Sequence, residues 1–139
     1  MNKSSIPYTY QVDSCRSFHS VFNESIKTFH NIELYGYILD EYFWANATVN
    51  PSNEGFCIPN CLVSGIFNLS KCARSGNIDL PIYLSMPHYL FGDKKLIDDC
   101  IGLKPNFTEH RTIVYFEPLT GITMKANKRG TILTHYINK

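Results

Sequence analysis

Three of the five cysteines in this 139-residue chain lie close together, in a stretch that also holds three prolines. The stretch runs from Gly55 to His88 and contains Cys57, Cys61 and Cys72. Cys57 and Cys61 are near enough in sequence to form a local bridge, whereas Cys72 needs a distant partner. Because Cys15 is the only cysteine upstream, the economical long-range bridge joins Cys15 to Cys72. Other connectivities stay open, since four of five cysteines can pair in many ways.

These two bridges would differ in their effect on folding. In the chain-entropy description, closing the long loop from Cys15 to Cys72 stabilises the folded state by about 4 kcal/mol. The short loop from Cys57 to Cys61 contributes about 2 kcal/mol on the same basis. The long bridge is therefore expected to matter more.

An excess of N-glycosylation sequons indicates an extracellular or lumenal chain. Random order of the twelve Asn with the twenty Ser and Thr predicts about 1.7 sequons, whereas five are present. Glycosylated chains pass through oxidising compartments, where cysteines pair. The sequon asparagines are Asn2, Asn23, Asn46, Asn68 and Asn106, of which the terminal Asn2 carries the least weight.

The start of the chain does not match this compartment. Residues 1–7 lack the apolar core of a signal peptide, and no apolar stretch approaches the roughly 18 residues of a membrane span. We therefore expect the chain to be a piece of a larger ectodomain, or a truncated product of such a gene.

Composition favours a β-rich domain. Aromatic residues make up 14% of the chain and charged residues 18%, below the roughly 25% of an ordinary soluble domain. The net charge of +1 gives no strong field that would steer the chain to nucleic acid or to an anionic membrane. Residues 1–139 fit one domain, and partners must be inferred from sites.

Alternating apolar and polar residues predict several strands, with one helical segment. Pro81 and Pro87 stand at the two ends of one predicted strand and place this strand at a sheet margin, because proline cannot donate a backbone hydrogen bond. The polar segment 40–54 is expected to be an exposed loop, with Phe43 and Trp44 anchored in the core. The predicted strands lie within Val12–Leu39 (two strands, with a turn at Asn23–Ser25), Gly65–Leu69, Pro81–Pro87, Thr112–Glu117 with Gly121–Ala126 as a hairpin, and Thr131–Ile137.

The segment 93–101 changes to helical spacing. Asp93 is a suitable N-cap, and Gly102 is expected to end the helix. The apolar face consists of Leu96, Ile97, Cys100 and Ile101. Cys100 is therefore predicted to be a buried free thiol that packs as a small hydrophobe, and a reactive nucleophile is disfavoured.

The chain carries no hydrolase, metalloprotease or nucleotide-binding motif, so we expect neither enzymatic activity nor a cofactor. A zinc site at Cys57, Cys61 and Cys72 is disfavoured because a second close ligand pair is missing. His88 and His110 are interpreted as structural histidines in preference to a pH switch.

A small basic cluster lies near the end of the predicted hairpin and consists of Lys125, Lys128 and Arg129. It could contact an anionic ligand or a lipid headgroup. A solvated edge that discourages strand pairing is the preferred interpretation.

Six blocks, in unbroken order from about Val12 to Lys139, resemble the class B scavenger receptors. These blocks are SCRS at Ser14–Ser17, GFCIPNC at Gly55–Cys61, SGIFNLSKC at Ser64–Cys72, PIYLSMPHYL at Pro81–Leu90, GLKPN with EH within Gly102–His110, and EPLTGITMKANKR at Glu117–Arg129. The lysosomal branch of the family is the nearest likeness.

The resemblance implies a β-rich α+β fold. It would be part of an antiparallel β-barrel ectodomain with a lipid tunnel, a helical apex and a membrane helix at each end. By position, it implies bridges Cys15–Cys72 and Cys57–Cys61, whereas Cys100 has no disulfide role in the family. Asn46 and Asn68 match glycosylated positions of the lysosomal branch; Asn23 and Asn106 lack that support.

The implied function is that of a fragment of a membrane-anchored receptor that binds lipids or lipoproteins and transfers lipid through the tunnel. Alternatives are a lysosomal-type receptor that sorts a partner enzyme, or a truncated product without independent function. The resemblance places the protein in the plasma or lysosomal membrane, with this segment extracellular or lumenal. Membrane anchors and apex fall outside the matching blocks, so ligand choice is expected elsewhere, and Gly55 replaces a cysteine of some members.

Overall fold

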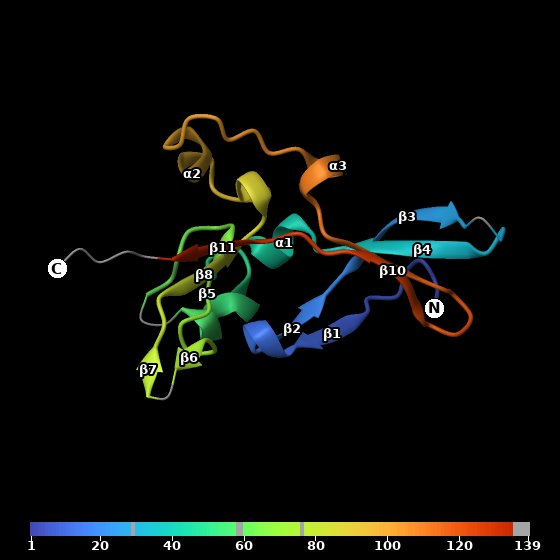
Figure 1. Cartoon of the computed structure of the whole chain (residues 1–139), viewed down its shortest axis with the longest axis horizontal. Helices are drawn as coiled ribbons and strands as arrows, with labels where there is room; N and C mark the ends of the chain where they lie inside the picture. Colours follow the sequence, from blue (N-terminus) through green and yellow to red (C-terminus); the bar gives the residue numbers. More distant parts are fainter. Residues whose placement is uncertain (29, 58–59, 76, 135–139) are drawn as a thin grey trace.

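The computed structural model describes residues 1–28, 30–57, 60–75 and 77–134. Short strands predominate, and helices are limited to one or two turns (Figure 1). In chain order the elements are β1 (Tyr8–Gln11), η1 (Val12–Ser14), β2 (Arg16–His19), β3 (Val21–Lys27), β4 (Glu33–Ile38), α1 (Glu41–Trp44), η2 (Pro51–Phe56), β5 (Ile66–Asn68), β6 (Arg74–Ser75), β7 (Ile78–Asp79), β8 (Ile82–Ser85), η3 (Pro87–Tyr89), α2 (Lys94–Asp98), α3 (Phe107–His110), β9 (Ile113–Phe116), β10 (Thr123–Asn127) and β11 (Thr131–Thr134).

The strands form antiparallel sheets at two ends of an elongated molecule (Figure 1). A four-stranded sheet has the order β10-β9-β4-β3, and a three-stranded sheet has the order β11-β8-β5. The strand pairs β1-β2 and β6-β7 form two further, two-stranded sheets in the described part of the chain. The β-rich architecture is confirmed, but none of the sheets in the described part closes on itself. The barrel and the lipid tunnel thus stay predictions.

One face of the four-stranded sheet forms a small core. Leu34, Ile38, Ile113 and Tyr115 are buried there because the antiparallel register places them on the same side. The ring of Tyr115 lies across β4 at Gly36, where a side chain would meet it. Its hydroxyl donates a 2.6 Å hydrogen bond to Glu24 on β3. Burial, together with this bond, raises the pKa of Tyr115 to about 12, so the phenol stays protonated.

The opposite face of this sheet carries an aromatic ladder. Phe22, Tyr37 and Phe116 pack edge to face along neighbouring strands, with centroids 5.7–5.9 Å apart. The ammonium of Lys3 lies 5.5 Å from the ring centre of Phe22, and the Tyr37 hydroxyl donates to the carbonyl of Asn2. The first residues of the chain therefore cover aromatic rings of this face.

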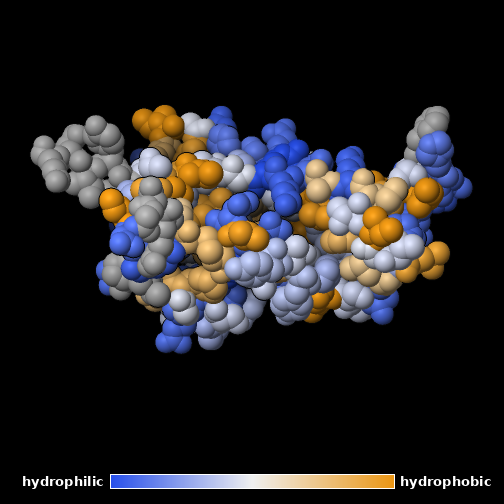
Figure 2. Space-filling view, turned by 60° about the horizontal axis from the view of Figure 1, so that its bottom comes forward, coloured by the Kyte–Doolittle hydropathy of each residue, from blue (hydrophilic) through white to orange (hydrophobic). Residues whose placement is uncertain are grey.

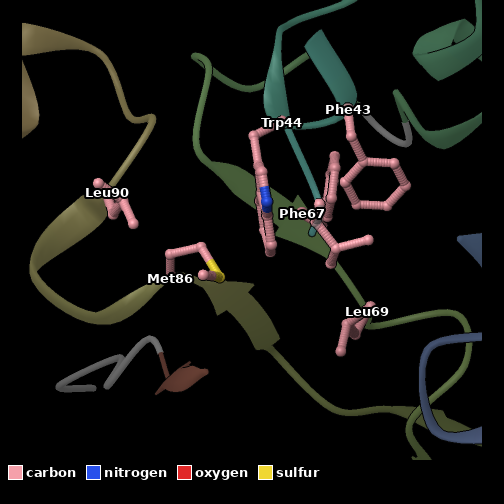
Figure 3. Packing of buried hydrophobic residues seen from close by; sticks show 7 residues of the cluster. Phe43, Trp44, Phe67, Leu69, Met86 and Leu90 are labelled. Atoms are coloured by element: carbon pink, nitrogen blue, oxygen red, sulfur yellow. The ribbon is translucent and has the colours of Figure 1, made fainter. Parts of the chain in front are cut away.

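The second core joins α1 to the three-stranded sheet. Phe43 and Trp44 are 1% and 2% exposed, which confirms that this pair anchors in the core. Trp44 stacks on Phe67 of β5, with ring centroids 4.7 Å apart. Figure 3 shows the indole between Phe67 on one side and Met86 and Leu90 on the other.

Three expectations about local structure are wrong. Asn23–Ser25 lies inside β3 and is not a turn, because β3 continues to Lys27 and pairs with β4. The strand between Pro81 and Pro87 does not lie at a sheet margin: β8 is the central strand of its sheet and pairs on both sides. Both prolines stand outside the paired residues, so they block neither edge. Segment 40–54 is not an exposed loop: it contains α1 and most of η2, and the amides of Asn50 and Asn53 are buried.

The helix at 93–101 is shorter than predicted, and its C-terminal part is exposed. Asp93 caps α2 by accepting a hydrogen bond from the Lys95 amide, as expected. However, α2 ends at Asp98, so Cys100 and Ile101 do not continue a buried face. The prediction that Cys100 is buried is wrong: it is a free cysteine exposed to solvent.

The C-terminal hairpin is confirmed. β9 and β10 pair antiparallel with a bulge between Thr123 and Lys125, and Gly121 adopts the positive φ of 72° that the turn requires. β11 pairs with β8 over Thr131–Thr134, while the rest of the predicted strand, residues 135–137, lies outside the described residues.

We predict that Gly36→Ala destabilises the fold by about 1–3 kcal/mol, because the new methyl group would lie 2.8 Å from Cε1 of Tyr115. Urea unfolding at neutral pH measures the loss. Gly55→Ala is the matched control, since an added Cβ meets no atom within 4 Å there. Equal stability of the two variants would contradict the packing of Tyr115 over β4.

Candidate functional site

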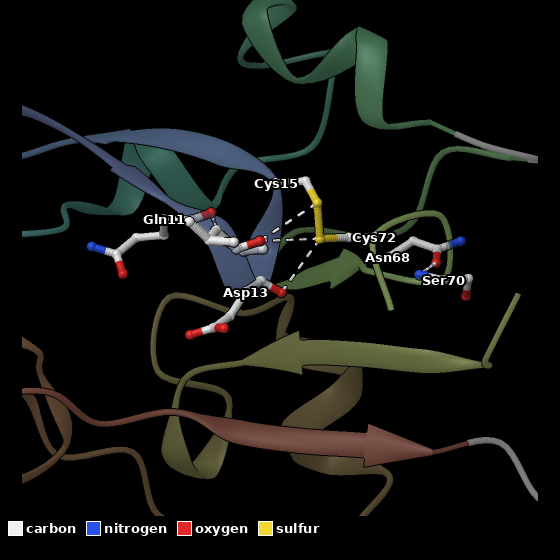
Figure 4. The surroundings of a disulfide bond; sticks show 8 residues. Gln11, Asp13, Cys15, Asn68, Ser70 and Cys72 are labelled. Carbon is white, nitrogen blue, oxygen red and sulfur yellow. Dashed lines mark hydrogen bonds between the residues drawn. A yellow bond between two sulfur atoms is a disulfide. The ribbon is translucent and has the colours of Figure 1, made fainter. Parts of the chain in front are cut away.

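A disulfide anchors the start of β2 to the turn that follows β5 of the three-stranded sheet. The β1-β2 hairpin turns through η1, and Cys15 ends the turn in the left-handed conformation with φ 50°. The structure pairs Cys15 with Cys72, at a Cα separation of 5.7 Å (Figure 4). The bridge implied by the resemblance is therefore present, and it holds Arg16 next to the second core.

Arg16 is buried in a box of aromatic rings. Its guanidinium carbon lies 4.7 Å from the ring centre of Phe43 and 4.1 Å from those of Phe56 and Phe67. Among the described residues, no carboxylate pairs with it, and its Nε and Nη1 atoms have no hydrogen-bond partner. Burial lowers the pKa of Arg16 to about 10, so the side chain is still protonated at neutral pH. We call Arg16 with these three rings the Arg16 box.

A buried amide completes the box. Nη2 of Arg16 donates a 2.7 Å hydrogen bond to Oδ1 of Asn53. The Nδ2 group of Asn53 in turn donates to the carbonyls of Phe43 and Ala45. Asn53 thus links the charge on β2 to the backbone of α1. The sequence did not predict this link, because the polar segment 40–54 was interpreted as an exposed loop. No sequence pattern distinguishes its buried asparagines from exposed ones.

The second bridge lies beside the box. Cys57 and Cys61 are bonded, with a Cα separation of 4.1 Å, as the resemblance implies. A cavity of about 20 Å³ lies between this clip, η2 and β5, and Phe56 and Phe67 are among its lining residues. This volume holds about one water molecule and is far too small for a lipid chain.

A larger groove of about 550 Å³ lies between α1 and the loop before α2. Its lining combines carboxylates with apolar side chains. Asp40 and Asp93 accept hydrogen bonds from backbone amides at the starts of α1 and α2, so capping accounts for both. The groove is lined by Asp40, Glu41, Tyr42, Val49, Phe91 and Asp93, among others.

Exposed apolar side chains lie along three of the edge strands, β1, β10 and β11. Tyr8 and Tyr10 on β1 are 72% and 60% exposed, on the face opposite Arg16. Ile132 on β11 is 68% exposed although it shares a face with the core residue Phe67 and with Leu84, which is partly buried against the core. We call Tyr8, Tyr10, Met124 and Ile132 the apolar rim; Figure 2 shows apolar surface at both ends of the molecule.

In the described part of the chain, β1, β10 and β11 each pair with a strand on one side only. An unpaired edge with apolar side chains is a site for strand addition or for burial against other protein or lipid. The apolar rim is therefore suited to contact with other protein or with lipid.

The basic cluster does not converge on one point. Lys125 lies over the ring of Tyr115, whereas Lys128 donates to the side chain of Gln11. Arg129 donates to the carbonyl of Arg111. These side chains brace β10 and the following turn, and the interpretation as a solvated edge that discourages strand pairing stays a prediction.

Three predicted glycosylation positions share one local geometry. Oδ1 of Asn46, Asn68 and Asn106 accepts a hydrogen bond from the backbone N–H of the Ser or Thr two residues later. This Asx turn places each sequon in a turn at the surface. Asn23 instead lies at the bulge of β3, within a paired strand.

Comparison with known proteins gives consistent matches. The sequence model of the CD36 family matches residues 1–137. The chain is 35% identical to lysosome membrane protein 2 of Mus musculus over 141 residues, covering 100% of this chain and 28% of that protein. For the Homo sapiens protein of that name, the identity is 34%, with coverages of 95% and 26%.

A second group of matches consists of receptors. Scavenger receptor class B member 1 of Mus musculus is 38% identical over 118 residues, covering 85% of this chain and 22% of that protein. The chain thus spans about a quarter of the length of the relatives it matches. No helix in the part of the chain that the structure describes is long and apolar enough to cross a membrane.

We predict that Arg16→Ala destabilises the fold by about 3 kcal/mol, because it leaves a cavity between three rings and an unpaired Oδ1 on Asn53. Arg129→Ala, at an exposed arginine that also donates a hydrogen bond, should change stability by less than about 0.5 kcal/mol. Urea unfolding followed by Trp44 fluorescence compares them. A loss at Arg16 no larger than that at Arg129 would show that the box contributes little.

We also predict that Asn46, Asn68 and Asn106 are glycosylated, and that Asn23 is occupied much less, when the chain is secreted behind a heterologous leader. The Asx turns present the first three sequons at the surface, whereas strand pairing confines Asn23. Glycopeptide mass spectrometry measures occupancy at each site. Full occupancy of Asn23 would be the contrary result.

Proposed function

Because the chain belongs to the CD36 family, we propose that it forms part of the wall of a receptor ectodomain that binds lipids or lipoproteins. In this proposal the wall belongs to a hydrophobic tunnel through which lipid is transferred. The family match over residues 1–137 and the scavenger receptor names among the relatives support a receptor role. The proposed role includes no catalytic step and no cofactor.

The observation that carries the proposal is the apolar rim. A soluble domain that ends at these strands would leave Tyr8, Tyr10 and Ile132 in water, at a cost in hydrophobic free energy. In a longer ectodomain the same side chains would face further strands or an apolar ligand. The small cavity beside the Arg16 box offers no such space.

We further propose that the receptor lies in the lysosomal or plasma membrane and that this segment is on the lumenal or extracellular side. The names of the relatives support the membrane assignment. Two disulfides support the oxidising side, because such bridges persist outside the cytosol.

A second candidate function is recruitment of a protein partner by a lysosomal-type receptor. The open groove with Tyr42, Val49 and Glu41 favours it, since exposed aromatic and charged groups there could take part in a protein contact. The two candidates use different surfaces, so variants can separate them.

Photolabelling tests the lipid proposal. The oxidised chain is incubated with a diazirine fatty acid, irradiated and mapped by mass spectrometry. Replacement of Tyr8, Tyr10 and Ile132 by Ser should reduce labelling about tenfold, because these side chains supply most of the exposed apolar area of the rim.

The matched control replaces Tyr42 and Val49 by Ser, which removes exposed apolar groups from the groove alone. This variant should label like the unmodified chain. Labelling that depends on the groove and not on the rim would refute the wall proposal.

A further inference from the structure

Two histidines from distant parts of the chain stack on each other. His88 lies in η3 and His110 at the end of α3, and their rings are 4.4 Å apart between centroids with an interplanar angle of 11°. The stack connects the loop before α2 to the loop before β9. We call this pair the histidine latch.

The hydrogen bonds of the latch require neutral rings. Nδ1 of His88 accepts a hydrogen bond from the backbone N–H of Lys104, at 3.2 Å. Nδ1 of His110 accepts one from the backbone N–H of Asn106, at 3.0 Å. A nitrogen that accepts a hydrogen bond carries no proton, so each neutral ring is protonated on Nε2.

The loop that carries His88 is strained. His88, Tyr89 and Phe91 have φ values of 53°, 52° and 65°, a conformation that costs a residue with a side chain about 1–2 kcal/mol. Such a conformation persists only where the surroundings hold it. The latch provides this support on one side of the loop.

The other side of the loop is held by packing. The backbones of Gly65 and Gly92 are in such close contact that a Cβ on Gly65 would lie 2.3 Å from Cα of Gly92. Asp93 donates its amide hydrogen to the carbonyl of Ser64. Leu90 is buried in the cluster that contains Trp44. The loop therefore lies between the latch and the second core.

The charged groups around the latch leave it without a counterion. In the described part of the chain, neither imidazole forms an ion pair with a carboxylate. On α2, which packs on η3, Lys94 pairs with Asp98. Arg111, next to His110, pairs with Glu24. The remaining ionisable groups of these segments are Tyr89, Asp93, Lys95, Asp99, Lys104 and Glu109.

We propose that the histidine latch is an acid-sensitive switch that sets the position of the loop 88–93. Uptake of a proton from solvent converts an accepting Nδ1 into an N–H group that faces a backbone N–H, so that hydrogen bond is lost. A second proton places two positive rings 4.4 Å apart. The latch then opens and the strained loop relaxes.

Opening changes the groove, because Phe91, Gly92 and Asp93 form part of its lining. The latch thus couples solvent acidity to the shape of a surface opening of about 550 Å³. This role is independent of whether the apolar rim binds lipid.

Trp44, the single tryptophan of the chain, reports on the loop through Met86 and Leu90 (Figure 3). We expect its fluorescence to change reversibly when the solution is acidified from about pH 7 to about pH 5, because an opened latch releases the loop that carries Leu90. The double variant His88→Asn/His110→Asn should lose this transition. The matched control His19→Asn should keep it, although His19 contacts Phe43 in the same core and lies 3.9 Å from Asp40.

Hydrogen exchange of the unmodified chain gives a test that needs no variant. The protection factors of the Lys104 and Asn106 amides should fall at least about tenfold on acidification, while that of Tyr115 in β9 stays constant. Unchanged protection at Lys104 and Asn106 overturns the proposal. So does a fluorescence transition that persists in the double variant or disappears in His19→Asn.

Discussion

The burial of one positive charge organises the middle of this molecule. Arg16 lies among rings supplied by α1, η2 and β5, and the amide of Asn53 is its hydrogen-bond partner. Withdrawing a guanidinium from water is costly unless ring faces and dipoles replace part of its hydration. The box can therefore exist only if the separate segments meet correctly. The bridge at Cys15 limits how far the charged strand can move away.

The sequence predicted those features that depend on local pattern or on pairing of neighbouring strands. The hairpin of β9 and β10 followed from alternation and a turn glycine, and Phe43 with Trp44 were correctly placed in the core. The prediction that segment 40–54 is an exposed loop was wrong because two of its asparagines are buried as hydrogen-bonding partners. Composition does not reveal such burial. The prediction that Cys100 is buried was wrong because helical spacing alone does not determine whether a short helix continues.

The candidate surfaces were harder to predict than the bridges. The apolar rim depends on which strands lie at the edges, and strand order is a property of the whole sheet. Ile132 illustrates this point, because its alternation is that of a core residue while its position at an edge exposes it. The histidine latch joins residues from two loops that no sequence period relates. The stacked rings and their accepting nitrogens support the proposed pH response, whereas the sequence alone favoured structural histidines.

The Cys15–Cys72 bridge also affects what happens when the chain is cut. It encloses β2, β3, β4, α1, η2 and β5, so most of the first half of the chain lies within one covalent ring. Cleavage of an exposed turn inside the ring, such as residues 30–32 between β3 and β4, opens the ring but releases no fragment. The core strands stay joined on both sides of the cut. In a compartment rich in proteases, a nicked chain would thus remain a single molecule with its sheets in place.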